Sequence, residues 1–330
     1  MNYYVPPFTI TNEMLDKVSS IMKKIGKLDH YNNLNKMPNL RRNNRIKSIY
    51  SSLAIESNSL SFNQVKDVID GKMVIGSQKE IQEVKNAYDA YLKINDVNPY
   101  KLNDLKMIHG IMTNLIIDDA GFFRKGDEGV FDTKGRCVHI CPPPGQINDL
   151  MINLFEWMKQ KKNEIHPLIL SSVFHYEFVF IHPFSDGNGR MARFWQNVIL
   201  TKWEPIFEYI PIESEIKEFQ DEYYIVINSC NAKGDSTLFI LFILDMIDKV
   251  LNKLIDNVND EENNVNSYVK SLLDVMDVGV RYKTSELMDL LGLKSRVSFR
   301  NNYLKPALNS GLILMTYPDN PTNKNQTYYK

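Results

Sequence analysis

The segment from His182 to Arg193, HPFSDGNGRMAR, gathers an imidazole, a carboxylate, two glycines and two arginines in a short stretch. A histidine with an ordinary pKa of about 6.5 can take a proton from a hydroxyl at neutral pH, so His182 is the candidate general base. Asp186 is the candidate ligand for Mg²⁺, which takes one or two protein carboxylates together with phosphate oxygens. These residue types indicate chemistry on a phosphate ester.

The glycines predict how a phosphate is held. Gly187 and Gly189 flank Asn188 and allow a tight turn that opens directly onto a predicted helix, 190–203. The free N–H groups at a helix N-terminus form an anion site. We therefore expect the backbone of these three residues to hold phosphate oxygens.

Two arginines follow the turn. Arg190 and Arg193 are three residues apart, so they share one face of the predicted helix. Each guanidinium can donate two hydrogen bonds to phosphate oxygens, and the pair favours a polyphosphate over a single phosphate. Phe184 is the predicted apolar anchor of the loop.

Helices are predicted to position this loop. Apolar residues recur at three- and four-residue spacing in the segments 41–56, 79–94, 101–115, 147–160, 167–180 and 190–203. The apolar run 238–247 is too short to span a bilayer and predicts a buried helix. One region, 128–144, has short β-prone pieces around a turn and ends in three prolines, which predicts a β-hairpin.

A second, smaller domain is predicted at the C-terminal end. The segment 256–266 is acidic and Asn-rich, so we expect a linker there. Residues 267–330 read as three short helices followed by a β-prone hairpin, which is the order of a winged helix-turn-helix. This domain contains a basic stretch without acids: Lys294, Arg296, Arg300 and Lys305.

Composition limits the class of protein. The chain has 330 residues, 43% hydrophobic and 24% charged, which fits about two globular domains. Its formal net charge of −1 gives no global electrostatic case for binding nucleic acid or a membrane. Three cysteines argue against a disulfide framework, and no leader or membrane segment is recognised. We expect a cytoplasmic protein that does not bind a membrane.

The ordered set from His182 to Arg193 resembles, without a mismatch, the HxFx[DE]GNGRxxR signature of the Fic (filamentation induced by cyclic AMP) family. The hairpin at 128–144 resembles the flap of that family, and 267–330 resembles the winged-helix tail of many bacterial members. The resemblance implies a mainly α fold, a Fic-type helical bundle with a flap. It divides the chain into an N-terminal helical region (1–100), a catalytic domain (101–255), the linker and the winged helix.

The resemblance implies transfer of AMP from ATP to a Ser, Thr or Tyr hydroxyl of a protein, self-modification included. His182 then deprotonates the hydroxyl, and Asp186 holds Mg²⁺ on the phosphates. The Gly187–Gly189 amides, Asn188 and Arg190 bind phosphates. By the same resemblance Arg193 holds the γ-phosphate, while Tyr224 and Asn231 match positions that line the adenine and ribose pocket.

The partner implied is a protein target docked along the flap, and self-association stays open. Within the family, removal of AMP from targets and phosphate transfer are alternatives. From a different class, a DNA-binding regulator that acts through the winged helix is a weaker alternative, because only the basic stretch supports it.

A second motif predicts a brake. Ser52 and Glu56 lie four residues apart on one face of the predicted helix 41–57. They resemble the [ST]xxxE[GN] motif of self-inhibited Fic proteins, in which the Glu pairs with the second arginine, here Arg193. Ser57 stands where that motif has Gly or Asn, which puts the tightness of inhibition in question.

Overall fold

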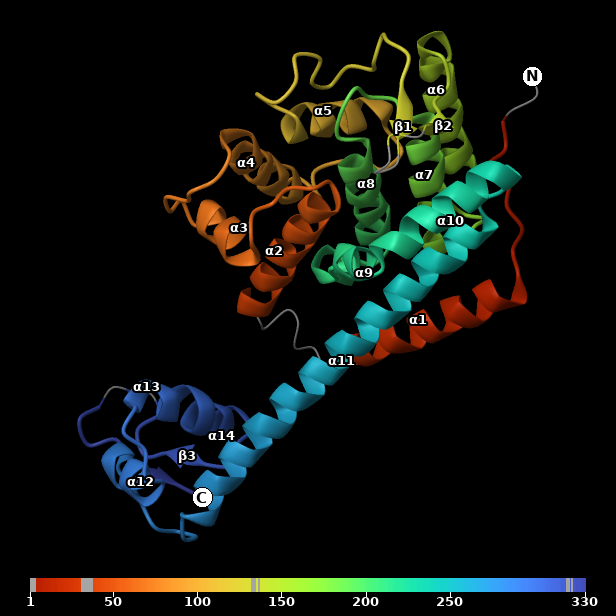
Figure 1. The fold of residues 1–330 in the computed structure, drawn as a ribbon. Coiled ribbons are helices and arrows are strands. Elements are labelled where there is room, and N and C mark those ends of the chain that lie inside the picture. Colours follow the sequence, from red (N-terminus) through yellow and green to blue (C-terminus); the bar gives the residue numbers. More distant parts are fainter. Residues whose placement is uncertain (1–3, 31–37, 132–134, 136, 319–320, 322) are drawn as a thin grey trace. The chain divides into compact units, whose positions relative to one another are not determined.

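The structure is a computed structural model that describes residues 4–30, 38–131, 135, 137–318, 321 and 323–330. The chain folds into two compact units, unit 1 (residues 1–252) and unit 2 (residues 253–330) (Figure 1). The described part is mainly helical with two small hairpins, which confirms the predicted fold class. The N-terminal helices and the predicted catalytic domain lie in one unit. No described helix is long and apolar enough to cross a bilayer.

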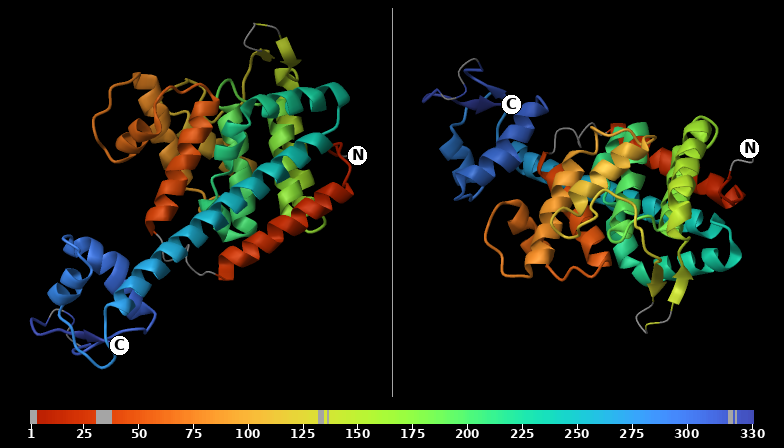
Figure 2. Two further views of the ribbon diagram at one scale, coloured as in Figure 1. Left: turned by 60° about the horizontal axis from the view of Figure 1, so that its bottom comes forward. Right: turned by 90° about the horizontal axis from the view of Figure 1, so that it is seen from above.

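Unit 1 is built around two central helices, α7 (Pro167–Ile181) and α8 (Asn188–Trp203). Twelve of the fifteen residues of α7 are buried, as expected of a helix that other elements cover on most sides. In both views of Figure 2, the helices α2 to α4 lie on one side of α8 and α6 on the other. The surrounding helices are α1 (Asn12–His30), α2 (Pro38–Ile55), α3 (Phe62–Ile69), α4 (Gln78–Leu92), α5 (Leu102–Met112), α6 (Pro144–Lys161), η2 (Pro205–Tyr209), α9 (Ile212–Glu218) and α10 (Gln220–Lys233).

The predicted hairpin is confirmed. Strand β1 (Gly129–Phe131) pairs antiparallel with β2 (Cys137–Ile140). Apart from Gly135, which has a φ of 75°, the turn expected at 132–136 lies outside the described residues. Pro144 then begins α6, because a proline is tolerated in the first turn of a helix.

The segment 256–266, predicted as a linker, is helical. Helix α11 (Thr237–Asp274) runs through it from unit 1 into unit 2. The sequence between 237 and 274 has no Gly or Pro, so nothing breaks the helix. Asn and Asp lower helix propensity by a few tenths of a kcal/mol each, which is too little to end the helix, and Glu is a good helix former.

Unit 2 has the predicted order of a winged helix-turn-helix. After α11 come α12 (Thr284–Leu290) and a second continuous helix made of α13 (Arg296–Ser298), the π-helical η3 (Phe299–Leu304) and α14 (Lys305–Asn309). Strands β3 (Leu314–Met315) and β4 (Tyr328–Tyr329) pair antiparallel. Its separate core includes Leu272, Leu287, Phe299 and Ile313.

Candidate active site

The loop between α7 and α8 begins and ends with left-handed residues. His182 caps α7 with φ 50° and ψ 60°, and its N–H donates to the carbonyl of Phe178. Gly187, with φ 82°, begins α8. A left-handed histidine is uncommon, since only Gly adopts this region without cost. These two left-handed residues reverse the chain direction, so His182 and the N-terminus of α8 belong to one tight loop.

Asn188 ties this loop together. Its side-chain Nδ2 donates to the carbonyl of Phe184 at 2.7 Å, and its Oδ1 accepts from the Phe184 N–H at 3.0 Å. Phe184 is fully buried, as its expected role as an anchor requires. The amide of Asn188 is therefore occupied with the loop itself. What remains of Asn188 for an anion is its backbone N–H at the helix N-terminus.

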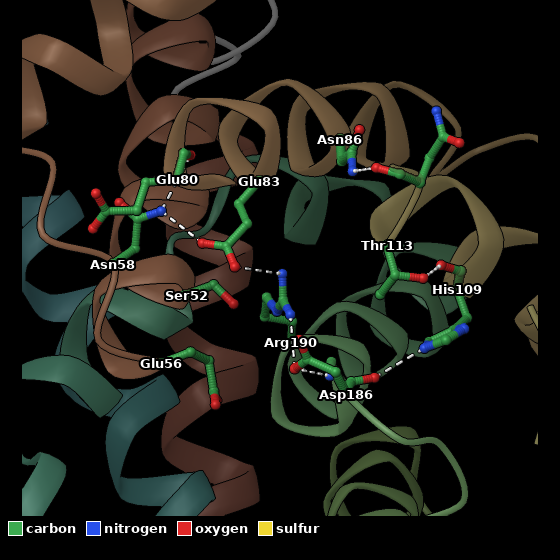
Figure 3. Close-up of polar contacts among 12 residues, drawn as sticks. Ser52, Glu56, Asn58, Glu80, Glu83, Asn86, His109, Thr113, Asp186 and Arg190 are labelled. Atoms are coloured by element: carbon green, nitrogen blue, oxygen red, sulfur yellow. Dashed lines mark hydrogen bonds and ion pairs between the residues drawn. The ribbon is translucent and has the colours of Figure 1, made fainter. Parts of the chain in front are cut away.

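His109 supports the loop from α5 and was not identified from the sequence. Its Nδ1 accepts the N–H of Gly121 at 2.9 Å, so Nε2 carries the proton and donates to the carbonyl of Asp186 at 3.0 Å (Figure 3). Its ring stacks on Phe184 with centroids 3.6 Å apart. Burial lowers the pKa of His109 to about 4, which keeps the ring neutral. No local spacing signals this contact, because 77 residues separate the partners.

Arg124 is a second support that the sequence did not reveal. The guanidinium is buried and donates to the carbonyls of His182 (2.8 Å), Gly126 (2.7 Å) and Pro142 (2.6 Å). The last two residues lie on either side of the hairpin. Beside it, His139 of β2 donates to the carbonyl of Phe180 at 2.8 Å. The hairpin is thus fixed to the end of α7 that carries His182.

The ring of His182 is arranged as a base. Its Nδ1 lies 3.3 Å from the carbonyl of Val179. A carbonyl can only accept, so Nδ1 carries the proton and Nε2 of the neutral ring is the basic atom. Burial lowers the pKa of His182 below its ordinary value of 6.5. The ring is therefore neutral, and able to take a proton, at pH 7.

Asp186 is half-exposed beside the N-terminus of α8. Its Oδ1 accepts the N–H of Gly187 at 2.6 Å and Nη2 of Arg190 at 3.1 Å. Within the described part of the chain, no contact engages its second oxygen, and no group of three or more potential metal ligands is found. A single carboxylate fits Mg²⁺ that is held mainly by phosphate and water oxygens.

Arg190 has unused donors. Its side chain is 4% exposed, and among the described residues neither Nε nor Nη1 has a hydrogen-bond partner. Glu83 of α4 lies 3.7 Å from Nη1 and is itself held by Nδ2 of Asn58 at 2.8 Å (Figure 3). Buried donors without partners are rare in folded proteins, and an incoming anion would satisfy them.

Arg193 is bound to α2. Its Nε donates to Oγ of Ser52 at 3.0 Å, and its Nη2 donates to the Ser52 carbonyl at 2.9 Å and to Oε1 of Glu56 at 2.8 Å. The Arg193 side chain is 1% exposed and that of Glu56 is 37% exposed. Burial alone would lower the pKa of Arg193, but the Glu56 carboxylate raises it above its ordinary value. The structure therefore contains the Glu–Arg contact that the motif implied.

Gly189 explains how close the carboxylate comes to α8. A Cβ on this residue would lie 2.2 Å from Oε1 of Glu56 and 3.2 Å from Nη1 of Arg193. No side chain fits in that space. The Glu56 carboxylate thus lies against the N-terminal turn of α8, where an anion is favoured by the free N–H groups and the helix dipole.

Tyr224 and Asn231 both lie on α10. The hydroxyl of Tyr224 donates to the carbonyl of Ile55 at 3.4 Å, next to Glu56. Asn231 instead accepts the hydroxyl of Tyr176 at 2.9 Å through its Oδ1. Tyr224 is thus close to the end of α2, whereas Asn231 is hydrogen-bonded to Tyr176 of α7.

Ser57, two residues after the end of α2, has a left-handed backbone with φ 68°. This is the position at which a helix commonly ends in Gly or Asn. The left-handed backbone gives a physical reason for Gly or Asn in the motif. Most other residues are strained there, because their Cβ comes too close to the following carbonyl oxygen.

We expect Ser57→Gly to stabilise unit 1 by about 0.5–1 kcal/mol, because relief of the left-handed strain exceeds the entropy cost of a glycine. The melting temperature should rise by about 2–3 °C, measured by differential scanning calorimetry. Ser59→Gly is the control, since Ser59 does not have a positive φ. Equal or lower melting temperatures for Ser57→Gly would contradict the strain argument.

The fold and this loop define a Fic domain. The Fic/DOC family profile matches residues 99–200, and the profile of the C-terminal domain of Fic-like (filamentation induced by cAMP) proteins matches residues 267–329. A crystal structure of a Fic family protein from Desulfovibrio desulfuricans G20 is 38% identical, with a TM-score of 0.75, and the match covers 99% of this chain and 98% of that one. The chain belongs to the Fic family.

Curated relatives carry the name protein adenylyltransferase Fic. That of Culex quinquefasciatus is 29% identical over 252 residues, covering 72% of this chain and 46% of the relative. That of Aedes aegypti is 30% identical over 216 residues, covering 62% of this chain and 41% of the relative. This chain thus spans less than half the length of these two relatives.

Proposed function

We propose that the protein is an adenylyltransferase that moves AMP from ATP to a Ser, Thr or Tyr hydroxyl of a protein, with release of pyrophosphate. The observation that carries the proposal is the convergence of a neutral His182, the N-terminal turn of α8 and two buried arginines on one loop. The name of the curated relatives supports the same reaction.

In this proposal, Nε2 of His182 takes the proton of the target hydroxyl, and the oxygen attacks the α-phosphate of ATP. The bond between the α-phosphorus and the bridging oxygen breaks, and pyrophosphate leaves. The N–H groups of Gly187–Gly189 and the buried guanidinium of Arg190 stabilise the negative charge on the phosphates. Because His109 and Asn188 hold the loop before any ligand binds, these donors need little rearrangement.

Asp186 is the residue that would hold Mg²⁺, through the carboxylate oxygen that is not bound to Gly187 and Arg190. When bound, the metal neutralises phosphate charge. Tyr224 of α10, whose hydroxyl contacts the end of α2, is proposed to line the nucleotide pocket. Asn231 is proposed to do so after exchanging its bond to Tyr176.

We further propose that α2 is an inhibitory helix. Glu56 occupies Nη2 of Arg193, and its carboxylate lies against the turn at Gly189, where a phosphate would bind. The γ-phosphate and Glu56 then compete for one guanidinium. Ser52 holds Arg193 in place through two hydrogen bonds, so the arginine stays aligned whichever anion is bound.

The reaction class is tested with ATP labelled at either the α- or the γ-phosphate. We expect the α label, and not the γ label, to appear on the protein itself or on proteins of a cell extract, read on a denaturing gel. The Glu56→Gly variant is used beside the wild type so that inhibition does not hide the activity. Transfer of the γ label would identify a kinase instead, and no transfer of either label would contradict both reactions.

A further inference from the structure

Unit 2 contains a groove of about 1160 Å³ whose lining includes six basic side chains beside polar and apolar ones. Asp289 is the one acid among the lining residues that the structure describes. The volume exceeds the roughly 300–1,000 Å³ of a usual small-molecule pocket. The basic lining residues are all exposed and are Lys283, Lys294, Arg296, Arg300, Lys305 and Lys324.

The groove is strongly basic although the net charge of unit 2 is close to zero. Residues 253–330 carry ten Lys and Arg and nine Asp and Glu residues, so the unit as a whole is close to neutral. The groove nevertheless collects six of those cations and one of those acids. Within the described part of unit 2, none of the six cations is in an ion pair. The groove therefore presents a local excess of uncompensated positive charge.

Three elements form the groove, and they are those of a helix-turn-helix with a wing. Lys283 and Thr284 come from the start of α12, Arg296 and Arg300 from the second helix, and Lys324 from the segment between β3 and β4. Modules of this kind place the second helix in the major groove of DNA and contact the backbone with flanking elements. The cations thus lie on the surface that such a module turns toward a duplex.

The π-helical turn aligns two of these cations. The N–H of Lys305 donates to the carbonyl of Arg300, a bond that joins residues five apart. In a regular α-helix, residues five apart point in directions that differ by about 140°. The wider π turn brings them close to one face. Arg300 and Lys305 consequently face the groove together.

We propose that this groove binds the phosphate backbone of duplex DNA. Lys and Arg contacts to phosphates supply most of the affinity of such binding and do not depend on sequence. The hydroxyl and amide side chains of Thr284, Ser285 and Asn323 in the same lining are further donors to phosphate oxygens. This binding is separate from the AMP-transfer site, which lies in unit 1.

The test measures fluorescence anisotropy of a labelled random-sequence duplex titrated with the full chain, without ATP, at 50 and 200 mM salt. With about four phosphates neutralised, we expect affinity to fall about 100-fold between the two salt concentrations. The double variant Arg296→Gln/Arg300→Gln should bind more than tenfold more weakly, with a salt slope smaller by about 2. Lys270→Gln, an exposed lysine of α11 outside the groove, should bind like the wild type.

Three results would overturn the proposal. They are no binding at 50 mM salt, equal weakening by the control and the double variant, and binding of an acidic peptide in preference to the duplex. Circular dichroism melting of each variant shows that unit 2 remains folded. Because the assay contains no ATP, its outcome does not depend on whether the protein transfers AMP.

Discussion

Replacing Glu56 with glycine is expected to raise AMP transfer about 10- to 100-fold. The carboxylate forms a charge-assisted hydrogen bond to Nη2 of Arg193, and such bonds contribute about 1.5–3 kcal/mol. When it is removed, that donor and the turn at Gly189 become free for the γ-phosphate. Each 1.4 kcal/mol corresponds to a factor of about ten in the occupancy of the productive state. The rate of α-label transfer at fixed ATP concentration measures the change.

A matched control is Glu164→Gly. Glu164 also follows a helix end and pairs with a cation, Lys161, at 2.5 Å, but the pair is at the surface. This variant should label like the wild type. Equal labelling by the wild type and Glu56→Gly would show that the contact with Arg193 does not limit activity, and it would remove inhibition from the proposal while leaving AMP transfer intact.

The His182→Ala variant is expected to lose AMP transfer by at least about 100-fold, because a positioned general base contributes roughly 10²–10⁴-fold. The measurement is made in the Glu56→Gly background, where the rate is high enough to quantify a loss. His182 has a positive φ, so His182→Asn is tested as well, since Asn tolerates this backbone region better than Ala. Loss of labelling in both variants separates chemistry from a change in loop shape.

The control is His166→Ala, at the opposite end of the same helix, where the ring accepts the N–H of Leu168 at 3.3 Å. It should retain labelling. The pH profile gives a second readout. A neutral His182 is required, so activity is present above its pKa and falls as the pH drops through it. Burial lowers that pKa, so the midpoint of the activity loss should lie at a pH below 6.5. A midpoint above 6.5 would contradict His182 as the base.

The loop and the helices beside it were predictable from the sequence because their signals are local. The residues from His182 to Arg193 lie within one turn and the start of one helix, and Ser52 and Glu56 lie four residues apart at the C-terminal end of α2. The helical periodicity of the surrounding segments also stops at 128–144, and the β-prone pieces there predicted the position of the hairpin. These features depend on neighbours in sequence, which a reader of the chain sees directly.

The residues that hold the loop could not be predicted in this way. His109 and Arg124 reach it from 77 and 58 residues away, and a lone histidine or arginine carries no local mark of such a contact. Asn188 was expected to bind phosphate, but its amide fits the Phe184 backbone, which only the folded turn reveals. The acidic, Asn-rich composition of 256–266 predicts a linker but not its conformation, which is helical because the segment contains no Gly or Pro.

The missing Cβ of Gly189 makes the protein respond unequally to mutation. Any side chain there would expel the Glu56 carboxylate, but it would also fill the space in which we propose that a phosphate binds. Changes at Glu56 remove only the competitor. Random mutagenesis should therefore recover gain-of-activity alleles in the codons of α2 and its end, whereas changes in the loop should reduce activity. Such a screen would separate the residues proposed to inhibit the protein, near Glu56, from the residues proposed to bind phosphate, in the loop at Gly189.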